Sequence, residues 1–295
     1  MGDKIRKRRV RQTYRVQDDP GPALQRIMLG EDLRELREAA GLSSDDAAVA
    51  LGWYRAKVSK VETGSAKLTD PEVEKLIETY AIGEDRANQL RRLAKDARRR
   101  LPATRVPDWA AKYVTLQATA ADIKLWFGDF VPGSLQTKAY ARAVLGASVI
   151  VSAADIEQMA EDREARAQRL ASGKGPLVWI VLGEEALRRN VGTPGVLLEQ
   201  LRYLRKIAEL PNVTLQVLPL SAGAHPALGM SFTILELGQQ QRTIVYMESL
   251  TGSDYLPKAN QVRIYSLVFG RLQAAAHNRE DSWTLLDDLI HELEE

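Results

Sequence analysis

The stretch GLSSDDAAVALGWYRAKVSKVETGS, residues 41–65, constrains the fold of this chain more than any other segment. It predicts two short helices separated at residues 51–53, and neither helix has enough apolar surface to fold alone. Helices that cross steeply need a small residue where their axes approach and a residue free to make the turn, roles that suit Ala48 and Gly52. They also need apolar side chains directed into one shared core, and the stretch offers Ala47, Leu51, Trp53, Val58 and Val61.

Hydrophobic periodicity predicts five helices in the first hundred residues. The first runs from about 28 to 40 and ends before Gly41, and the second is capped by Ser43 or Ser44 and ends near residue 51. The third spans about 54–63, the fourth opens at 69–71 with an acidic first turn and a proline, and the fifth runs over 84–100. We therefore expect an all-α region up to residue 100.

The charge of the chain is uneven. Residues 1–100 hold 22 Lys and Arg against 17 Asp and Glu, whereas the remaining residues hold 19 against 22. Seven of the cations precede Gln17, in a segment with little to bury, so residues 1–25 are predicted to form a basic disordered arm. Such an arm suits a polyanion, but it could also be a solvated tail.

The outer face of the predicted third helix is polar and carries Arg55, Ala56, Ser59 and Lys60. These side chains can donate or accept at the edges of DNA bases without forming a large hydrophobic patch. Residues 27–82 resemble the helix-turn-helix of the Xre family, the phage-repressor-like DNA-binding domains. The resemblance rests on Gly41-Leu42, on the Ala48 and Gly52 spacing, and on the closing residues 62–64. It implies a five-helix lambda-repressor-like domain over residues 26–100 that binds double-stranded DNA.

The resemblance also implies roles for single residues. Base-reading positions correspond to Arg55, Ala56, Ser59 and Lys60, and phosphate-contacting positions correspond to Ser44, Lys57, Thr63 and Lys67. A structural ion pair is implied between Arg37 and Glu62. The sequence departs from the family at Trp53-Tyr54, where a modest aliphatic residue and a small hydroxyl residue are usual. Tyr54 could hydrogen-bond a phosphate, or it could pack on its neighbours.

Beyond residue 100 the sequence changes character. Residues 101–107 form a proline-punctuated linker, and strand-like runs follow at 123–127, 177–182, 213–218, 232–237 and 243–247. Helical stretches lie between and after them at about 136–146, 153–171, 194–209, 258–276 and 281–293, and a hairpin is expected around Gly238. Strands that alternate with helices predict an α/β or α+β domain over residues 108–295.

This region resembles the uncharacterised domain that follows Xre-type helix-turn-helix domains in many actinobacterial regulators. The similarity lies in residues 130–145, 209–237 and 245–256. It implies a regulatory and dimerising domain that senses a ligand or holds a small partner protein encoded nearby. It implies no particular chemistry.

No motif in the chain predicts an enzyme. The absence of cysteine excludes disulfides, thiol catalysis and Cys-ligated metal sites, and SGKG at 172–175 lacks the flanking residues of a phosphate-binding loop. Glu184-Glu185 could be an acid pair or the acidic first turn of a short helix. We therefore expect no catalytic residues, no metal and no cofactor. Four polar residues that fall in predicted loops are hypothesised to form one pocket: His225, Glu248, Thr251 and Tyr255. The alternative is that these residues have turn and capping roles.

The expected protein is a cytoplasmic transcription regulator that binds DNA as a homodimer. No segment is apolar enough to span a membrane, and the start MGDKIRKRRVRQ has no hydrophobic signal region behind it. Two other functions stay open. One is an antitoxin-like autoregulator that holds a small partner protein, and the other is a nucleotide-directed enzyme tethered to DNA.

Overall fold

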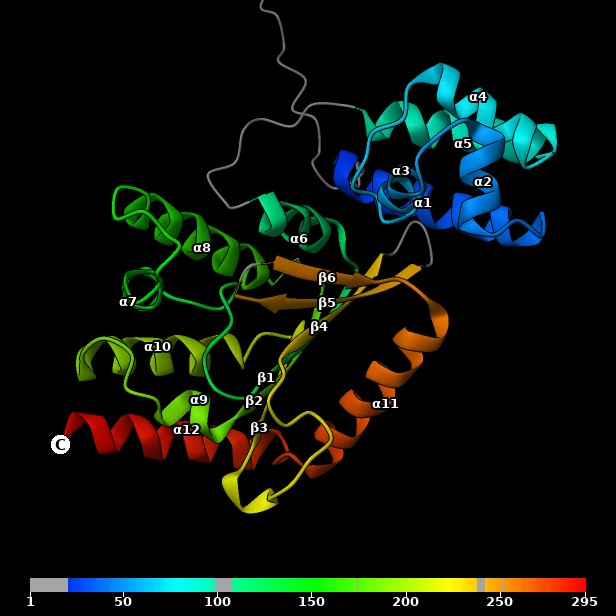
Figure 1. Cartoon of the computed structure of the whole chain (residues 1–295). Helices are drawn as coiled ribbons and strands as arrows, with labels where there is room; N and C mark the ends of the chain where they lie inside the picture. Colours follow the sequence, from blue (N-terminus) through cyan, green and yellow to red (C-terminus); the bar gives the residue numbers. More distant parts are fainter. Residues whose placement is uncertain (1–20, 99–107, 174, 238–241, 251) are drawn as a thin grey trace, which may run out of the picture.

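The structure is a computed structural model, and it describes residues 21–98, 108–173, 175–237, 242–250 and 252–295. The predicted linker at 101–107 and most of the predicted basic arm lie outside these ranges. Two domains follow one another along the chain: a helical domain and then a mixed sheet covered by helices (Figure 1). None of the helices in the described ranges has the length and apolar character that crossing a membrane requires.

The helical domain contains α1 (Gly21–Ala39), α2 (Ser44–Leu51), α3 (Arg55–Glu62), α4 (Asp70–Thr79) and α5 (Glu84–Ala97). Its helix ends form as the local sequence predicts. Ser43, and not Ser44, caps α2 by accepting a hydrogen bond from the Asp46 amide, and Thr69 caps α4. Gly52 ends α2 with a φ of 60°, a left-handed conformation that disfavours residues with a Cβ. The five helices share a core that includes Leu33, Ala47, Leu51, Val61, Leu76 and Leu90.

The first helix begins earlier than the sequence predicts. Residues 21–25, which the sequence assigns to a disordered arm, are helical, so that assignment is wrong for them. The reason is tertiary: Gln25 is buried, and Ile27 and Met28 belong to the apolar core of the second domain. Periodicity within the helical domain alone gives no sign of this packing.

The second domain is built on a six-stranded sheet in the order β3-β2-β1-β4-β5-β6. Strands β1 (Asp122–Phe127), β2 (Leu177–Gly183) and β3 (Val213–Leu218) pair in parallel, and β4 (Phe232–Leu237), β5 (Arg242–Ser249) and β6 (Gly252–Leu256) pair antiparallel, with β4 beside β1. The mixed sheet confirms the predicted α/β or α+β class. Residues 238–241, where the sequence predicts a hairpin, lie outside the described ranges.

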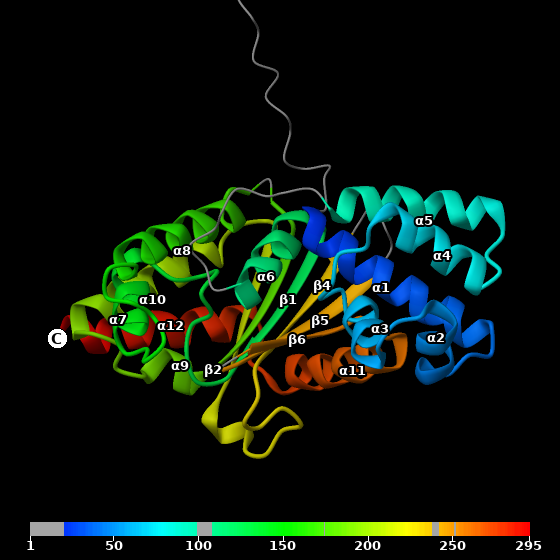
Figure 2. The ribbon, with the colours of Figure 1, turned by 45° about the horizontal axis from the view of Figure 1, so that its top comes forward.

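Helices cover both faces of this sheet (Figures 1 and 2). One face packs against α10 (Pro194–Ile207) and α12 (Arg279–Glu294), in a core that includes Leu125, Ile180, Leu201 and Leu286. The other face packs Trp126, Phe232 and Val245 against Phe269 and Leu272 of α11 (Ala259–Ala275). The remaining helices are α6 (Asp108–Thr119), α7 (Lys138–Gly146), α8 (Ile156–Leu170) and the short α9 (Glu184–Arg188), with a 3₁₀ turn at Leu220–Ala222.

Two elements are absent from the sequence prediction. The pattern indicates a loop where β6 lies, because the half-exposed residues of this edge strand show no clear alternation of buried and exposed positions. Helix α6 is not predicted at all, although its Leu116 is fully buried. In contrast, the acidic pair Glu184-Glu185 opens α9, in agreement with one of the two sequence interpretations.

The two domains are joined through α1, which lies beside the β4–β6 part of the sheet (Figure 2). The side chain of Asp32 in α1 is 2% exposed, and its carboxylate forms ion pairs with arginines from both domains. Arg86 of α5 lies 2.9 Å from its carboxylate, and Arg242 of β5 pairs with the same carboxylate and also with Glu31 at 3.1 Å. A buried carboxylate shared by two arginines ties the start of β5 to the helical domain.

Candidate functional site

The orientation of α3 decides which of its residues can meet a ligand. Val58 and Val61 are 2% and 4% exposed and face the core. The helix also lies very close to α1, since a Cβ placed on Gly30 would be 2.4 Å from the carbonyl oxygen of Val61. Only glycine fits there. The opposite face of α3 is exposed, and it carries Arg55, Ala56, Ser59 and Lys60.

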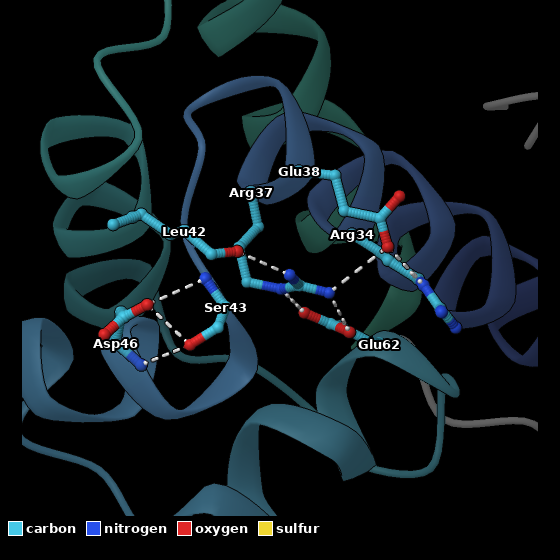
Figure 3. A network of polar contacts seen from close by, with 7 residues as sticks. All are labelled: Arg34, Arg37, Glu38, Leu42, Ser43, Asp46 and Glu62. Atoms are coloured by element: carbon cyan, nitrogen blue, oxygen red, sulfur yellow. Dashed lines mark hydrogen bonds and ion pairs between the residues drawn. The ribbon is translucent and has the colours of Figure 1, made fainter.

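A buried ion pair holds the carboxyl end of α3 in place (Figure 3). Arg37 of α1 donates to both carboxylate oxygens of Glu62, at 2.6 and 3.2 Å, and to the Leu42 carbonyl at 2.7 Å. The two side chains are only 6% and 9% exposed. The hydrogen bond to Glu62 raises the pKa of Arg37, so the guanidinium stays charged. The pair implied by the family resemblance is therefore present.

The exposed face of α3 is largely uncommitted to intramolecular contacts. Arg55 lies 3.3 Å from Asp45 of α2, but the two side chains are 73% and 66% exposed, so this ion pair is weak. Tyr54 is 87% exposed, which makes the packing interpretation of this residue wrong and leaves its hydroxyl accessible. Val49 of α2 is 83% exposed beside the same turn.

The positions implied for phosphate contacts differ in their surroundings. Lys67 is exposed in the loop before α4, Ser44 is the first residue of α2, and the hydroxyl of Thr63 donates to the Ser59 carbonyl at 2.9 Å. Lys57 is engaged within the domain: its ammonium pairs with Glu72 and lies 4.2 Å from the centroid of the Trp53 ring. The first contact joins α3 to α4, and the second joins α3 to the turn that precedes it.

The four residues of the pocket hypothesis are only partly brought together. His225 and Glu248 border one cavity of about 840 Å³, whereas Tyr255 borders a separate cavity of about 330 Å³ between α1 and β6. Thr251 lies outside the described residues. His225 makes local contacts, because its Nδ1 accepts from the Ala227 amide at 3.3 Å and its ring meets Trp126 edge-on at 5.0 Å. These contacts match the alternative interpretation, in which the histidine has a turn role.

A further cavity, of about 250 Å³, lies between α8 and the end of β5, and the sequence does not predict it. Its polar lining includes Arg163 and Arg166 of α8, together with Glu248, Tyr113 and Tyr246. Burial lowers the pKa of Arg163 to about 10 and also lowers that of Arg166, while it raises the pKa of Glu248. The sequence held a signal: the two arginines occupy helix positions between Met159 and Leu170, at the spacing of an apolar stripe.

Comparison with known protein families divides the chain in the same way. A family model described as a helix-turn-helix domain matches residues 28–90. A second, described as a domain of unknown function (DUF5753), matches residues 110–288, more than half of the chain. No curated protein matches the chain. The helix-turn-helix match supports a DNA-binding regulator, in agreement with the exposed polar face of α3.

Proposed function

Because the chain belongs to the DUF5753 family and carries a helix-turn-helix domain ahead of that domain, we propose that it is a sequence-specific transcription regulator of the Xre type. The C-terminal domain is proposed to bind an effector without transforming it, and the protein to act in the cytoplasm. The observation that carries the proposal is the face of α3, which holds four short or basic side chains clear of the core.

This face suits the major groove of B-form DNA, which admits one α-helix. Arg55 is proposed to donate to the O6 and N7 acceptors of a guanine, and Ser59 and Lys60 to contact neighbouring base edges. Ala56 would meet a thymine methyl group. Phosphate contacts would come from around this face, from Ser44, Tyr54, Thr63 and Lys67.

Lys57 is given a different role from the one its family position implies. Its ion pair with Glu72 links α3 to α4, and its ammonium also lies over the Trp53 ring in the turn before α3, so we propose that it positions the reading helix. A phosphate contact by this lysine would have to compete with the Glu72 carboxylate.

A homodimer is proposed for the DNA-bound state. One helix-turn-helix reads only a few base pairs, and proteins of this type reach useful specificity as symmetric dimers with half-sites roughly 34–36 Å apart. Four large apolar residues of α10 and α11 are buried within one chain: Leu201, Leu204, Phe269 and Leu272. We therefore propose that other residues make the dimer contact.

The test is a comparison of Arg55→Ala with the wild type on DNA selected from a random pool by the full-length protein. We expect Arg55→Ala to cost about 1–3 kcal/mol on the selected site and to relax the preference at one base pair. Arg92→Ala is the matched control, because Arg92 is an exposed arginine on α5. Equal losses on selected and random DNA for Arg55→Ala would contradict a base-reading role.

A further inference from the structure

Helix α8 has two arginines where an apolar stripe should continue. Met159 and Leu170 are 8% and 5% exposed, and Arg163 and Arg166 lie between them on the same face of the helix. Both arginines are partly buried and line the cavity beside β5. Placing guanidinium groups in the interior is costly unless an anion or several acceptors replace the water that is removed.

The described part of the chain supplies little of that compensation. Arg163 donates to the neutral side-chain oxygen of Gln136 at 2.8 Å. The Nε of Arg166 is buried and has no acceptor. Among the described residues, neither guanidinium forms an ion pair, and the charges of Asp162 and Glu248 offset the effect of burial on Arg166 only in part. Glu248, the acidic residue in the cavity lining, accepts a hydrogen bond from the Tyr246 hydroxyl at 2.9 Å.

The rest of the cavity wall is mainly apolar. The apolar side chains that line the cavity include Phe127, Phe130, Val144, Leu145, Ile150 and Val151. The larger cavity that contains His225 shares part of this lining, including Phe127, Phe130 and Glu248, so the two volumes adjoin. A site with a few convergent polar groups and an apolar wall is the usual form of a small-molecule pocket.

We infer that this cavity binds a small organic acid, whose carboxylate pairs with Arg166 and Arg163 and whose apolar body lies against Phe127, Phe130 and Val144. The inference rests on the proposed function, since it gives the chemical class of the effector. A carboxylate matches the planar fork of a guanidinium better than a spherical anion does, because two parallel hydrogen bonds can form. Burial lowers the pKa of both arginines, and a carboxylate paired with them would offset that effect.

The same cavity wall extends toward the helical domain. The rings of Tyr113 and Tyr246, which line the cavity, stack at 4.2 Å, and Tyr246 lies 5.2 Å from the ring of Tyr255. Tyr255 borders the space next to Ile27 and Glu31 of α1. An acid that displaces Tyr246 would therefore disturb the contact between the sheet and α1, and occupancy and DNA affinity would then be linked in both directions.

The probes are octanoate, 3-phenylpropionate and 1-naphthoate, each compared with its primary amide by calorimetric titration of the full-length protein. At least one acid is expected to bind with an affinity about ten times that of its amide, or higher. Arg166→Met should lower the affinity for that acid by a similar factor. Arg169→Met removes an exposed arginine of the same helix and should leave binding unchanged. Inorganic phosphate should bind more weakly than the acid, because it has no apolar body.

Thermal unfolding and DNA binding show whether Arg166→Met is folded, so that a loss of acid binding can be assigned to the missing guanidinium. Without added acid, Arg166→Met should melt no lower than the wild type, because it removes a buried unpaired charge, and it should still bind the selected DNA. A second variant, Glu248→Gln, should bind the acid more tightly than the wild type does. The inference is overturned if every amide binds as well as its acid, or if Arg166→Met binds the acid normally. Either result leaves the Arg55 test of DNA reading untouched.

Discussion

Replacing Arg37 by methionine should destabilise the helical domain, although Arg37 is not among the residues proposed to contact DNA. Methionine keeps most of the side-chain length but removes both hydrogen bonds to Glu62 and the one to the Leu42 carbonyl. The Glu62 carboxylate, on a side chain 9% exposed, then has no buried partner at the end of α3.

The expected cost is large because one charge is left behind. Removing one partner of a buried ion pair costs about 3–5 kcal/mol, against a total stability of about 5–15 kcal/mol for a typical domain. Replacing both residues, as in Arg37→Met with Glu62→Met, removes both charges and should cost less than the sum of the single changes. The coupling expected for such directly bonded residues is about 1–3 kcal/mol.

Urea unfolding, followed by tryptophan fluorescence and far-ultraviolet circular dichroism, measures these free energies if the two transitions coincide. Arg34→Met is the matched control. Arg34 pairs with Glu38 on the same helix at 3.0 Å, but the side chains are 40% and 55% exposed, so its removal should cost no more than about 0.5 kcal/mol. A stabilising buried pair is contradicted if Arg37→Met costs no more free energy of unfolding than Arg34→Met, or if the costs of the Arg37 and Glu62 changes are additive.

Three further predictions follow from charge and assembly. Deleting residues 1–16 removes seven Lys and Arg, so the slope of log affinity for DNA against log salt should flatten by up to about 0.9 for each phosphate that the segment neutralises; an unchanged slope would make the segment a passive tail. Burial raises the pKa of the Glu248 carboxyl above its ordinary value of 4.5. The folded protein therefore loses stability as the pH rises from that value through the raised pKa. The urea midpoint of Glu248→Gln should therefore rise relative to that of the wild type as the pH increases. A difference between the two midpoints that does not change with pH would contradict the buried carboxylate. Sedimentation of the full-length protein should show a dimer on DNA with two half-sites, whereas one chain per site at saturation would rule out the symmetric arrangement.

The helix-turn-helix could be predicted from sequence because its determinants are local. The caps at Ser43 and Thr69, the left-handed turn at Gly52 and the inward set around Val58 and Val61 all lie within about thirty residues. Such signals depend on backbone geometry and helical period, which a short segment largely determines by itself. The five core strands were predictable for a similar reason, since each is a short apolar run between turn residues.

The cavity of the second domain could not be predicted in the same way. The pocket hypothesis grouped Glu248 with Tyr255, but the two residues line different cavities. The groups that define the site come from α6, α8 and β5, more than 130 residues apart at the extremes. The spacing of Arg163 and Arg166 between Met159 and Leu170 indicates that they lie on the covered face of α8, but only the fold shows that this face borders a cavity shared with Glu248.

Local sequence was enough to predict the helix-turn-helix and the alternation of strands and helices that follows it. Contacts distant in sequence explain why residues 21–25 are helical, why Lys57 pairs with Glu72, and why Asp32 joins the two domains. The physical reason is one of range. Local backbone preferences act between residues a few positions apart, whereas the burial of a charge, and therefore its role, depends on segments that meet only when the chain is folded.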